Sequence, residues 1–162
     1  MQIRHFESQD YPAVQAIYQE GIASGHATFQ TTVKSWEEFD QDMHSHSRLV
    51  AVSQDVILGW AAISPISTRA VYSGIAEVSI YVAYQAHGKG IGKKLMAELI
   101  RESEKHNIWT LQSSIFPENI GSLKLHESSG FRIIGKREKI GQMNGLWRDT
   151  ILMERRSQLV GV

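Results

Sequence analysis

The run 85–94, QAHGKGIGKK, joins a predicted strand over 76–82 to a long amphipathic helix and contains three alternating glycines. Glycine adopts backbone angles closed to other residues and lets a ligand approach the main chain closely. The N–H groups of such a turn point outward, and the helix N-terminus adds partial positive charge. Lys89, Lys93 and Lys94 add full charges nearby. The run therefore predicts a cradle for a pyrophosphate group.

Spacing distinguishes three kinds of phosphate loop. A Walker A loop needs Gly-x4-Gly-Lys-Ser/Thr, but His87 stands where the first glycine belongs and Lys94 where the hydroxyl belongs. A dinucleotide fingerprint, Gly-x-Gly-x-x-Gly, fits Gly88 and Gly90 but meets Lys93 at its third position. The remaining pattern, Gln/Arg-x-x-Gly-x-Gly/Ala, is met in full. Taken alone, the loop is also compatible with a plain glycine-rich turn.

A second motif follows at 119–131, NIGSLKLHESSGF. Asn119 is a good N-cap, and Gly130 suits the left-handed position just past a helix C-terminus. Phe131 then begins an apolar strand. The segment predicts a short helix with a defined start and stop.

The two motifs, in this order and spacing, resemble those of the GNAT acetyltransferase superfamily. The resemblance implies one domain over 1–162 with an α/β fold, a mixed and mostly antiparallel central sheet and helices on both faces. It also implies acetyl-CoA as co-substrate and no metal. The residues expected to bind acetyl-CoA are Ile80, Tyr81, Val82, Gln85, His87, Gly88, Lys89, Gly90, Ile91, Gly92, Lys93, Asn119 and Ser122.

Periodicity and turn signals alone predict a mixed α/β sheet with helices packed on it. A capping box at Ser35 and Glu38 begins a helix that runs to about His44, and Asp10 is expected to cap the first helix. The expected strands are 2–5, 48–53, 57–64, 76–82, 110–116, 131–139 and 146–154, and the other helices are 12–23, the one after the glycine loop and the one after Asn119.

Composition excludes several classes of function. The 162 residues include 17 basic and 17 acidic side chains, so no global charge favours nucleic acid or an anionic membrane as partner. The absence of cysteine excludes disulfides and a cysteine nucleophile. The first ten residues do not resemble a signal peptide, and no apolar run approaches the roughly 20 residues of a membrane span. We expect a soluble cytoplasmic protein.

A subgroup resemblance covers about 3–154. The segment 28–31 ahead of the Ser35 helix, His126, and the late segment 145–149, GLWRD, are similar to those of the phosphinothricin acetyltransferase group. This implies direct acetylation of the α-amino group of a small amino acid or analogue, such as phosphinothricin or methionine sulfoximine, by a homodimer. Gln30, where the group often has Glu, and His87, where it often has Arg, depart from the pattern.

Acetyl transfer needs a neutral amine, whereas most α-amino groups are protonated at pH 7, so a base must remove a proton. Strand alternation predicts that Glu77 shares a face with Ser79 and Tyr81, opposite the apolar face of the strand. The resemblance assigns Glu77 as the base, a main-chain N–H near Val82 as the oxyanion donor, and His126 as the acid for the departing thiolate. The plainer alternatives are a solvated glutamate and a packed histidine.

Substrate recognition is assigned by the resemblance to a loop before the catalytic strand and to residues near both ends of the chain. Arginine matches a carboxylate with its planar fork, and aromatic rings can line a pocket. The expected substrate-binding residues are Phe29, Arg69, Val71, Tyr72, Trp147 and Arg148. Aromatic residues more often form core, and most arginines lie on the surface.

Two other readings of the function stay open. The acceptor can be a different amine, namely a polyamine, an aminoglycoside or a protein N-terminus, or the chain can be a non-catalytic acyl-CoA-binding module. The pair His44 and His46 lacks a third zinc ligand at fitting spacing and is expected to form a polar helix end. Scattered cations are expected on the solvated surface: Lys34, Lys136, Arg137 and Lys139.

Overall fold

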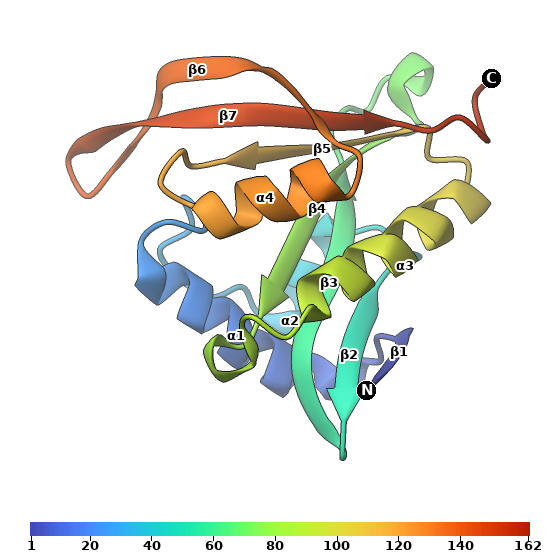
Figure 1. The fold of residues 1–162 in the computed structure, drawn as a ribbon, viewed down its shortest axis with the longest axis vertical. Helices are drawn as coiled ribbons and strands as arrows, with labels where there is room; N and C mark the ends of the chain where they lie inside the picture. Colours follow the sequence, from blue (N-terminus) through green and yellow to red (C-terminus); the bar gives the residue numbers. More distant parts are fainter.

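The sheet of the computed structural model, which describes residues 1–162, has the strand order β1-β2-β3-β4-β5-β7-β6 (Figure 1). All neighbouring strands are antiparallel except β4 and β5, which run parallel. The strands are β1 (Gln2–His5), β2 (Leu49–Ser53), β3 (Val56–Pro65), β4 (Ile75–Val82), β5 (Thr110–Ile115), β6 (Arg132–Met143) and β7 (Leu146–Arg156). The helices are α1 (Tyr11–Ser24), α2 (Trp36–Asp42), α3 (Ile91–Lys105) and α4 (Ile120–Ser128), with 3-10 turns η1 (Ser8–Asp10), η2 (Ala70–Tyr72) and η3 (Tyr84–Ala86). The predicted mixed, mostly antiparallel α/β sheet is confirmed.

Side chains of β4 alternate between two helical layers. Tyr81 stacks on Tyr18 of α1, with ring centroids 5.1 Å apart. On the opposite face, a Cβ added to Gly92 of α3 would lie 3.7 Å from the Val82 side chain. The odd-numbered residues of β4 therefore face α1 and the even-numbered ones face α3, as the alternation predicted.

An aromatic cluster attaches α1 and α2 to the sheet. Trp60 and Phe39 are fully buried and meet edge to face with centroids 5.5 Å apart. Trp60 also stacks on Tyr18 and Tyr81. Burying aromatic side chains of this size contributes several kcal/mol, about 3–5 kcal/mol for a Phe or Trp by truncation to Ala. The cluster fixes α1 against the face of β4 that carries the candidate base.

The predicted capping residues are confirmed at α2 and α4, and the predicted cap of α1 is wrong. Ser35 and Glu38 form the expected capping box, and Gly130 after α4 has a φ of 91°. Asp10, by contrast, makes no capping hydrogen bond to α1, because it is itself helical and ends the turn η1. Its carboxylate instead accepts two hydrogen bonds from Arg4, at 2.8 and 2.9 Å. The expectation that Asp10 caps α1 is therefore wrong.

Two tight hairpins order the strands at either end of the sheet. The turn Gln54–Asp55 between β2 and β3 has φ values of 49° and 64°, and the turn Asn144–Gly145 has 51° and 79°. Positive φ at both central residues is the two-residue turn that matches the twist of hairpin strands. Because Asn144–Gly145 supplies that turn, the β6–β7 ladder extends beyond the predicted 131–139 and 146–154 and projects from the sheet (Figure 1).

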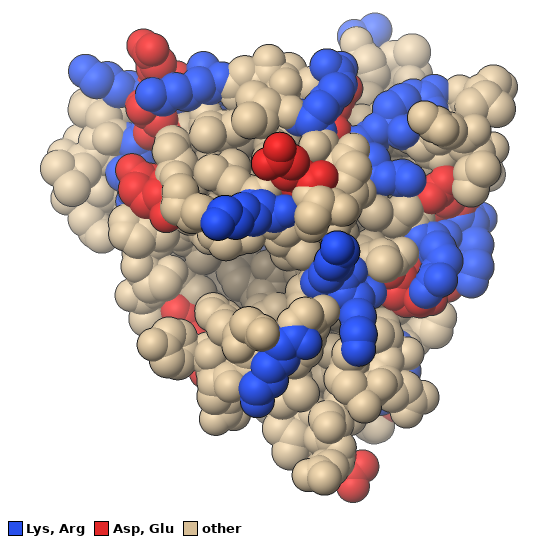
Figure 2. Space-filling view, in the orientation of Figure 1, with Lys and Arg blue, Asp and Glu red and all other residues tan.

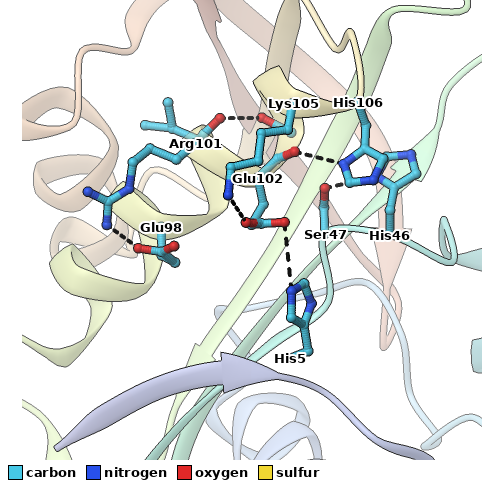
Figure 3. A network of polar contacts seen from close by, with 10 residues as sticks. His5, His46, Ser47, Glu98, Arg101, Glu102, Lys105 and His106 are labelled. Atoms are coloured by element: carbon cyan, nitrogen blue, oxygen red, sulfur yellow. Dashed lines mark hydrogen bonds and ion pairs between the residues drawn. The ribbon is translucent and has the colours of Figure 1, made fainter.

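The two histidines that follow α2 do not form a solvated helix end, because α2 stops at Asp42. His46 stacks on His44 at 4.7 Å and on His106 at 4.1 Å between ring centroids. Figure 3 shows His46 and His106 lying against each other beside Glu102 of α3, which also contacts His5 and Lys105. Burial, reinforced by the two neighbouring histidines and Arg48, lowers the pKa of His46 to about 4. The expectation of a polar helix end is therefore corrected to a stack of three histidine rings.

The lowered pKa of His46 predicts an acid-sensitive contribution to stability. The unfolded chain binds a proton at His46 near pH 6.5, whereas the folded chain does so only near pH 4, so this stability is lost as the pH falls between those values. Urea unfolding of His46→Gln should show a smaller loss over this interval than wild type. His5→Gln, at a mostly exposed ring, is the matched control. Equal pH dependence in His46→Gln and wild type would contradict the assignment.

No helix of the chain combines the length and apolar character required to cross a membrane.

Candidate active site

Strands β4 and β5 separate soon after they meet. Their parallel pairing covers only Ile75–Glu77 against Thr110–Gln112. Beyond this point β5 continues along β7 as far as Ile115, while β4 continues along β3 as far as Val82. The sheet therefore opens between its two central strands.

The main chain of β4 directs groups that have no strand partner into this opening. Ala83 donates its N–H to Leu58 on the β3 side, and successive residues of an antiparallel strand direct their main-chain groups to alternate edges. Tyr81 therefore faces β3, whereas Ile80 and Val82 face the opening. The carbonyl of Val82 accepts a hydrogen bond from His87 Nε2 at 2.8 Å. The N–H of Val82 remains directed into the gap.

A cleft of about 960 Å³ occupies the opening. We call it the outer cleft. Gly88 and Gly90 lie on its wall with φ values of 77° and 76°, so a side chain at either position would strain the turn. The first N–H groups of α3 follow directly and have no partner within the helix. The glycine turn predicted from the sequence therefore exists here, and it leads into a helix N-terminus, where N–H groups favour an anionic ligand.

Most residues expected to bind acetyl-CoA surround the outer cleft. Lys93 and Lys124 contribute cationic side chains to its lining, and Figure 2 shows basic side chains around a hollow at the end of β4. Asn119 caps α4 by accepting from the Ser122 N–H at 3.2 Å. The expected residues that line the cleft are Ile80, Tyr81, Val82, His87, Gly88, Gly90, Ile91, Gly92, Lys93, Asn119 and Ser122; Gln85 and Lys89 do not.

A second cavity of about 480 Å³, the inner pocket, lies on the α1 face of the sheet. Glu77 and Phe29 line it, as does Tyr81. Residues such as Val78, Ser79 and Ser114 line both cavities, so the inner pocket communicates with the outer cleft. A ligand in one cavity can therefore meet a ligand in the other where β4 and β5 separate.

Glu77 is half-buried in the inner pocket. Burial raises the pKa of its carboxyl above the ordinary value, and the positive charge of Arg137 opposes the rise only in part. A raised pKa brings the carboxyl nearer to the pKa of the ammonium group whose proton it must accept, which suits a general base. Arg137 is exposed on β6, as expected, and its charge acts on this carboxyl.

His126 is buried between α4 and β5. Its Nδ1–H donates to the Ser122 carbonyl at 2.7 Å, and its Nε2 accepts from the Ser113 hydroxyl at 2.8 Å. Burial lowers the pKa of the ring, and the bond to Ser122 opposes this effect. The neutral imidazole has no proton free for a departing thiolate. The geometry therefore disagrees with the expected acid role and matches the plainer alternative of a packed histidine.

Five of the six expected substrate residues line neither cavity, and Phe29 is the exception. Arg69 lies over the ring of Tyr72, at 5.3 Å, in the exposed loop that follows β3, and Val71 is exposed beside them. Trp147 is exposed at the start of β7. The loop begins directly after Pro65, which does line the inner pocket.

Arg148 was also expected to bind the substrate carboxylate, but its guanidinium is already bound by other residues of the protein. It donates to the Gly25 carbonyl and to the His26 ring, each at 3.0 Å, and pairs with Glu118. Its guanidinium lies 4.1 Å from the centroid of Phe116. Arg148 therefore fastens the segment after α1 to the β5–α4 connection and lines neither cavity.

Several residues of the inner pocket were not expected there, and Lys34 and Thr150 are the two that bear most on its chemistry. Lys34, expected on the solvated surface, lines the pocket and pairs with Asp42 at 2.9 Å. Thr150 lines it from β7 and is 4% exposed. Lys34 precedes a capping box in an irregular segment, where no periodicity indicates in which direction a side chain points. Thr150, by contrast, lies two residues after Arg148 in β7. Because side chains alternate along a strand, the sequence already indicated that Thr150 shares a face with Arg148.

The half-buried carboxylate of Glu77 should cost stability. Because its pKa is raised in the folded state, the fold favours the protonated form, and ionisation at neutral pH opposes folding. Glu77→Gln should therefore have a higher Tm than wild type at pH 7, and the gain should shrink as lower pH protonates the wild-type carboxyl. Glu127→Gln, at an exposed position on α4, is the control. A Tm below that of wild type at pH 7 would contradict this account.

The chain is similar to known enzymes over nearly its whole length. Residues 3–152 match the family model described as an acetyltransferase (GNAT) domain. A phosphinothricin N-acetyltransferase of Alcaligenes faecalis is 30% identical, with 94% of this chain and 81% of that protein covered. An L-methionine sulfoximine/L-methionine sulfone acetyltransferase of Pseudomonas paraeruginosa is 27% identical, with coverage of 94% and 92%.

Solved structures share the fold. A ribosomal-protein-alanine N-acetyltransferase from Brucella melitensis superposes with a TM-score of 0.89 at 31% identity, covering 97% of this chain and 100% of the other. A phosphinothricin acetyltransferase from Sinorhizobium meliloti, solved in complex with AcCoA, has a TM-score of 0.89 at 28% identity, with coverage of 99% and 90%. The chain belongs to the GNAT family of acetyltransferases.

Proposed function

We propose that this enzyme transfers acetyl from acetyl-CoA directly to the α-amino group of a small amino acid or analogue of the phosphinothricin, methionine sulfoximine or methionine sulfone type. The observation that carries the proposal is the junction of two cavities. The outer cleft has an anion cradle, and the inner pocket has a buried carboxylate. The named substrates of the two relatives described above support the acceptor class.

The residues of the outer cleft fit acetyl-CoA, which supplies the activated acetyl group. The N–H groups between Gly88 and the start of α3, with Lys93 beside them, suit the pyrophosphate. The open edge of β4 at Ile80 and Val82 offers main-chain partners to the amide groups of an extended arm. The Val82 N–H is the donor best directed to hold the acetyl oxygen as negative charge develops, and such a donor is worth about 2.7–4 kcal/mol elsewhere.

Glu77 acts as the base that takes the proton of the ammonium group, directly or through water. Its face of β4 lines the inner pocket, and the raised pKa of its carboxyl supports this role. His126 positions Ser113 and α4 at the wall of the outer cleft. The thiolate of CoA leaves without a proton from the ring, since a thiolate is a tolerable leaving group.

Lys34 is the one cation among the residues lining the inner pocket and is the best partner for the carboxylate of an amino acid. Phe29, which meets Phe116 edge to face at 4.8 Å, supplies an apolar wall. We retain Arg69, Val71, Tyr72 and Trp147 as substrate residues that act on closure of their exposed segments over the pocket. Gln30 also lines the pocket and contributes a neutral amide where related enzymes often have a carboxylate.

We also propose a cytoplasmic homodimer with one catalytic domain over 1–162. The projecting β6–β7 hairpin supports self-association, because it exposes several large apolar side chains that a second copy would cover. They are Ile133, Ile140, Leu146 and Trp147, each more than half exposed.

A protein N-terminus is the second candidate acceptor, because one structural neighbour is named for acetylating ribosomal-protein alanine. The lining of the inner pocket favours a free amino acid, since Lys34 pairs with Asp42 beside Glu77 and the site carries both signs of charge. Polyamines and aminoglycosides lack the carboxylate that Lys34 would bind. A purely acyl-CoA-binding module would have no need of the half-buried Glu77.

Thiol release from acetyl-CoA tests the proposal across a panel of amines. The panel holds phosphinothricin, methionine sulfoximine, methionine sulfone, the standard amino acids, spermidine, an aminoglycoside and a short peptide with N-terminal alanine. We expect turnover of the amino-acid analogues and little with the polycations or the peptide. Turnover of the peptide alone would replace the proposed acceptor, and acetyl-CoA binding without turnover of any amine would support the binding module.

Glu77→Gln in the same assay tests the base. Removal of a general base typically costs about 10²–10⁴-fold in kcat, and raising the pH should restore part of the loss because free amine becomes more abundant. Glu127→Gln should retain wild-type kcat. An unchanged rate and pH profile in Glu77→Gln would remove Glu77 from this role.

A further inference from the structure

Three buried side-chain polar atoms of the protein have no hydrogen-bond partner: His44 Nε2, Trp60 Nε1 and Thr150 Oγ1. Of these residues, only Thr150 lines one of the two cavities, the inner pocket, where it is 4% exposed. A buried hydroxyl without a partner costs about 1–3 kcal/mol. The hydroxyl of Thr150 is therefore poised to gain a partner from whatever fills the pocket.

The register of the sheet places Thr150 on the same face as Glu77. Glu77 is level with Gln112 of β5, which is level with Glu154 of β7. Because side chains alternate along a strand, Thr150, four residues from Glu154, shares this face. Ser114, which lines both cavities, lies on it as well. The pocket thus has a carboxylate on β4 and an unpartnered hydroxyl on β7, with β5 between them.

The distance between Glu77 on β4 and Thr150 on β7 determines which part of the substrate Thr150 can contact. Adjacent strands lie about 4.8 Å apart, and acetyl transfer takes place where β4 and β5 separate. Thr150 is on the far side of β5 from that point. The α-carboxylate of an amino acid is too close to its amine to reach so far, whereas a polar group on the γ or δ atom of the side chain extends in this direction.

We propose that Thr150 is a specificity-determining residue whose hydroxyl donates a hydrogen bond to an oxygen on the substrate side chain, of the sulfone, sulfoximine or phosphinate type. The inference deepens the proposed function and rests on it. A hydrogen-bond donor at this position favours binding of substrates that carry such an oxygen, because an apolar substrate side chain would leave the buried hydroxyl unpaired. Selection between methionine and its oxidised analogues then follows from one side chain of β7.

The test compares Thr150→Val, which removes the hydroxyl at nearly constant shape, with Thr150→Ser, which keeps it. Each is assayed for kcat/KM with methionine sulfone and for Ki with methionine as a competitor, which requires no turnover of methionine. Thr150→Val should lower kcat/KM for the sulfone about 10-fold and leave the Ki of methionine within about 2-fold. Thr150→Ser should retain the wild-type ratio of the two constants.

Two further measurements separate specificity from damage. The KM for acetyl-CoA should not change in Thr150→Val, and its Tm should equal or exceed that of wild type because an unpartnered buried hydroxyl is gone. The inference is overturned, while the proposed function stands, if an active Thr150→Val enzyme changes kcat/KM for methionine sulfone and the Ki of methionine to the same extent. It is also overturned if neither of these two constants changes. A wild-type enzyme without activity on any amino-acid analogue would overturn both the inference about Thr150 and the proposed function.

Discussion

The short parallel pairing of β4 with β5 is the constraint on which the rest of the site depends. Only three residue pairs join the two strands before each follows its antiparallel neighbour. The separation leaves one edge of β4 unpaired inside the protein, where exposed N–H and C=O groups require partners. An extended ligand with amide groups meets that requirement. The same separation connects the outer cleft to the inner pocket, so two substrates can approach from opposite faces of one sheet.

Helix packing maintains this opening. The stack of Tyr18, Trp60 and Tyr81 fixes α1 on one face of β4, and the close approach of Gly92 to Leu125 brings α3 and α4 together on the other. Arg148 fastens the segment after α1 to the β5–α4 connection through Gly25 and Glu118. Residues far apart in sequence thus keep the two cavities aligned.

Local signals in the sequence predicted the strands, the helices and the glycine turn before α3, because each depends on near neighbours. The positive φ of Gly88 and Gly90, the box at Ser35 and the alternation of β4 all follow from short-range sterics and hydrogen bonds. The inner pocket was harder to predict, because it joins α1, the segment after it, α2 and four strands. Lys34 could be placed there only by tertiary packing, and the occupied fork of Arg148 depends on partners more than 100 residues away.

Amide hydrogen exchange at Ile80 and Val82, with and without acetyl-CoA, tests the central claim most directly. We expect rapid exchange at both amides in the free enzyme and strong protection when acetyl-CoA is bound. Tyr81, whose N–H faces β3, should be protected in both states. Unchanged exchange at Ile80 and Val82 under saturating acetyl-CoA would contradict the claim that the open edge of β4 receives the co-substrate.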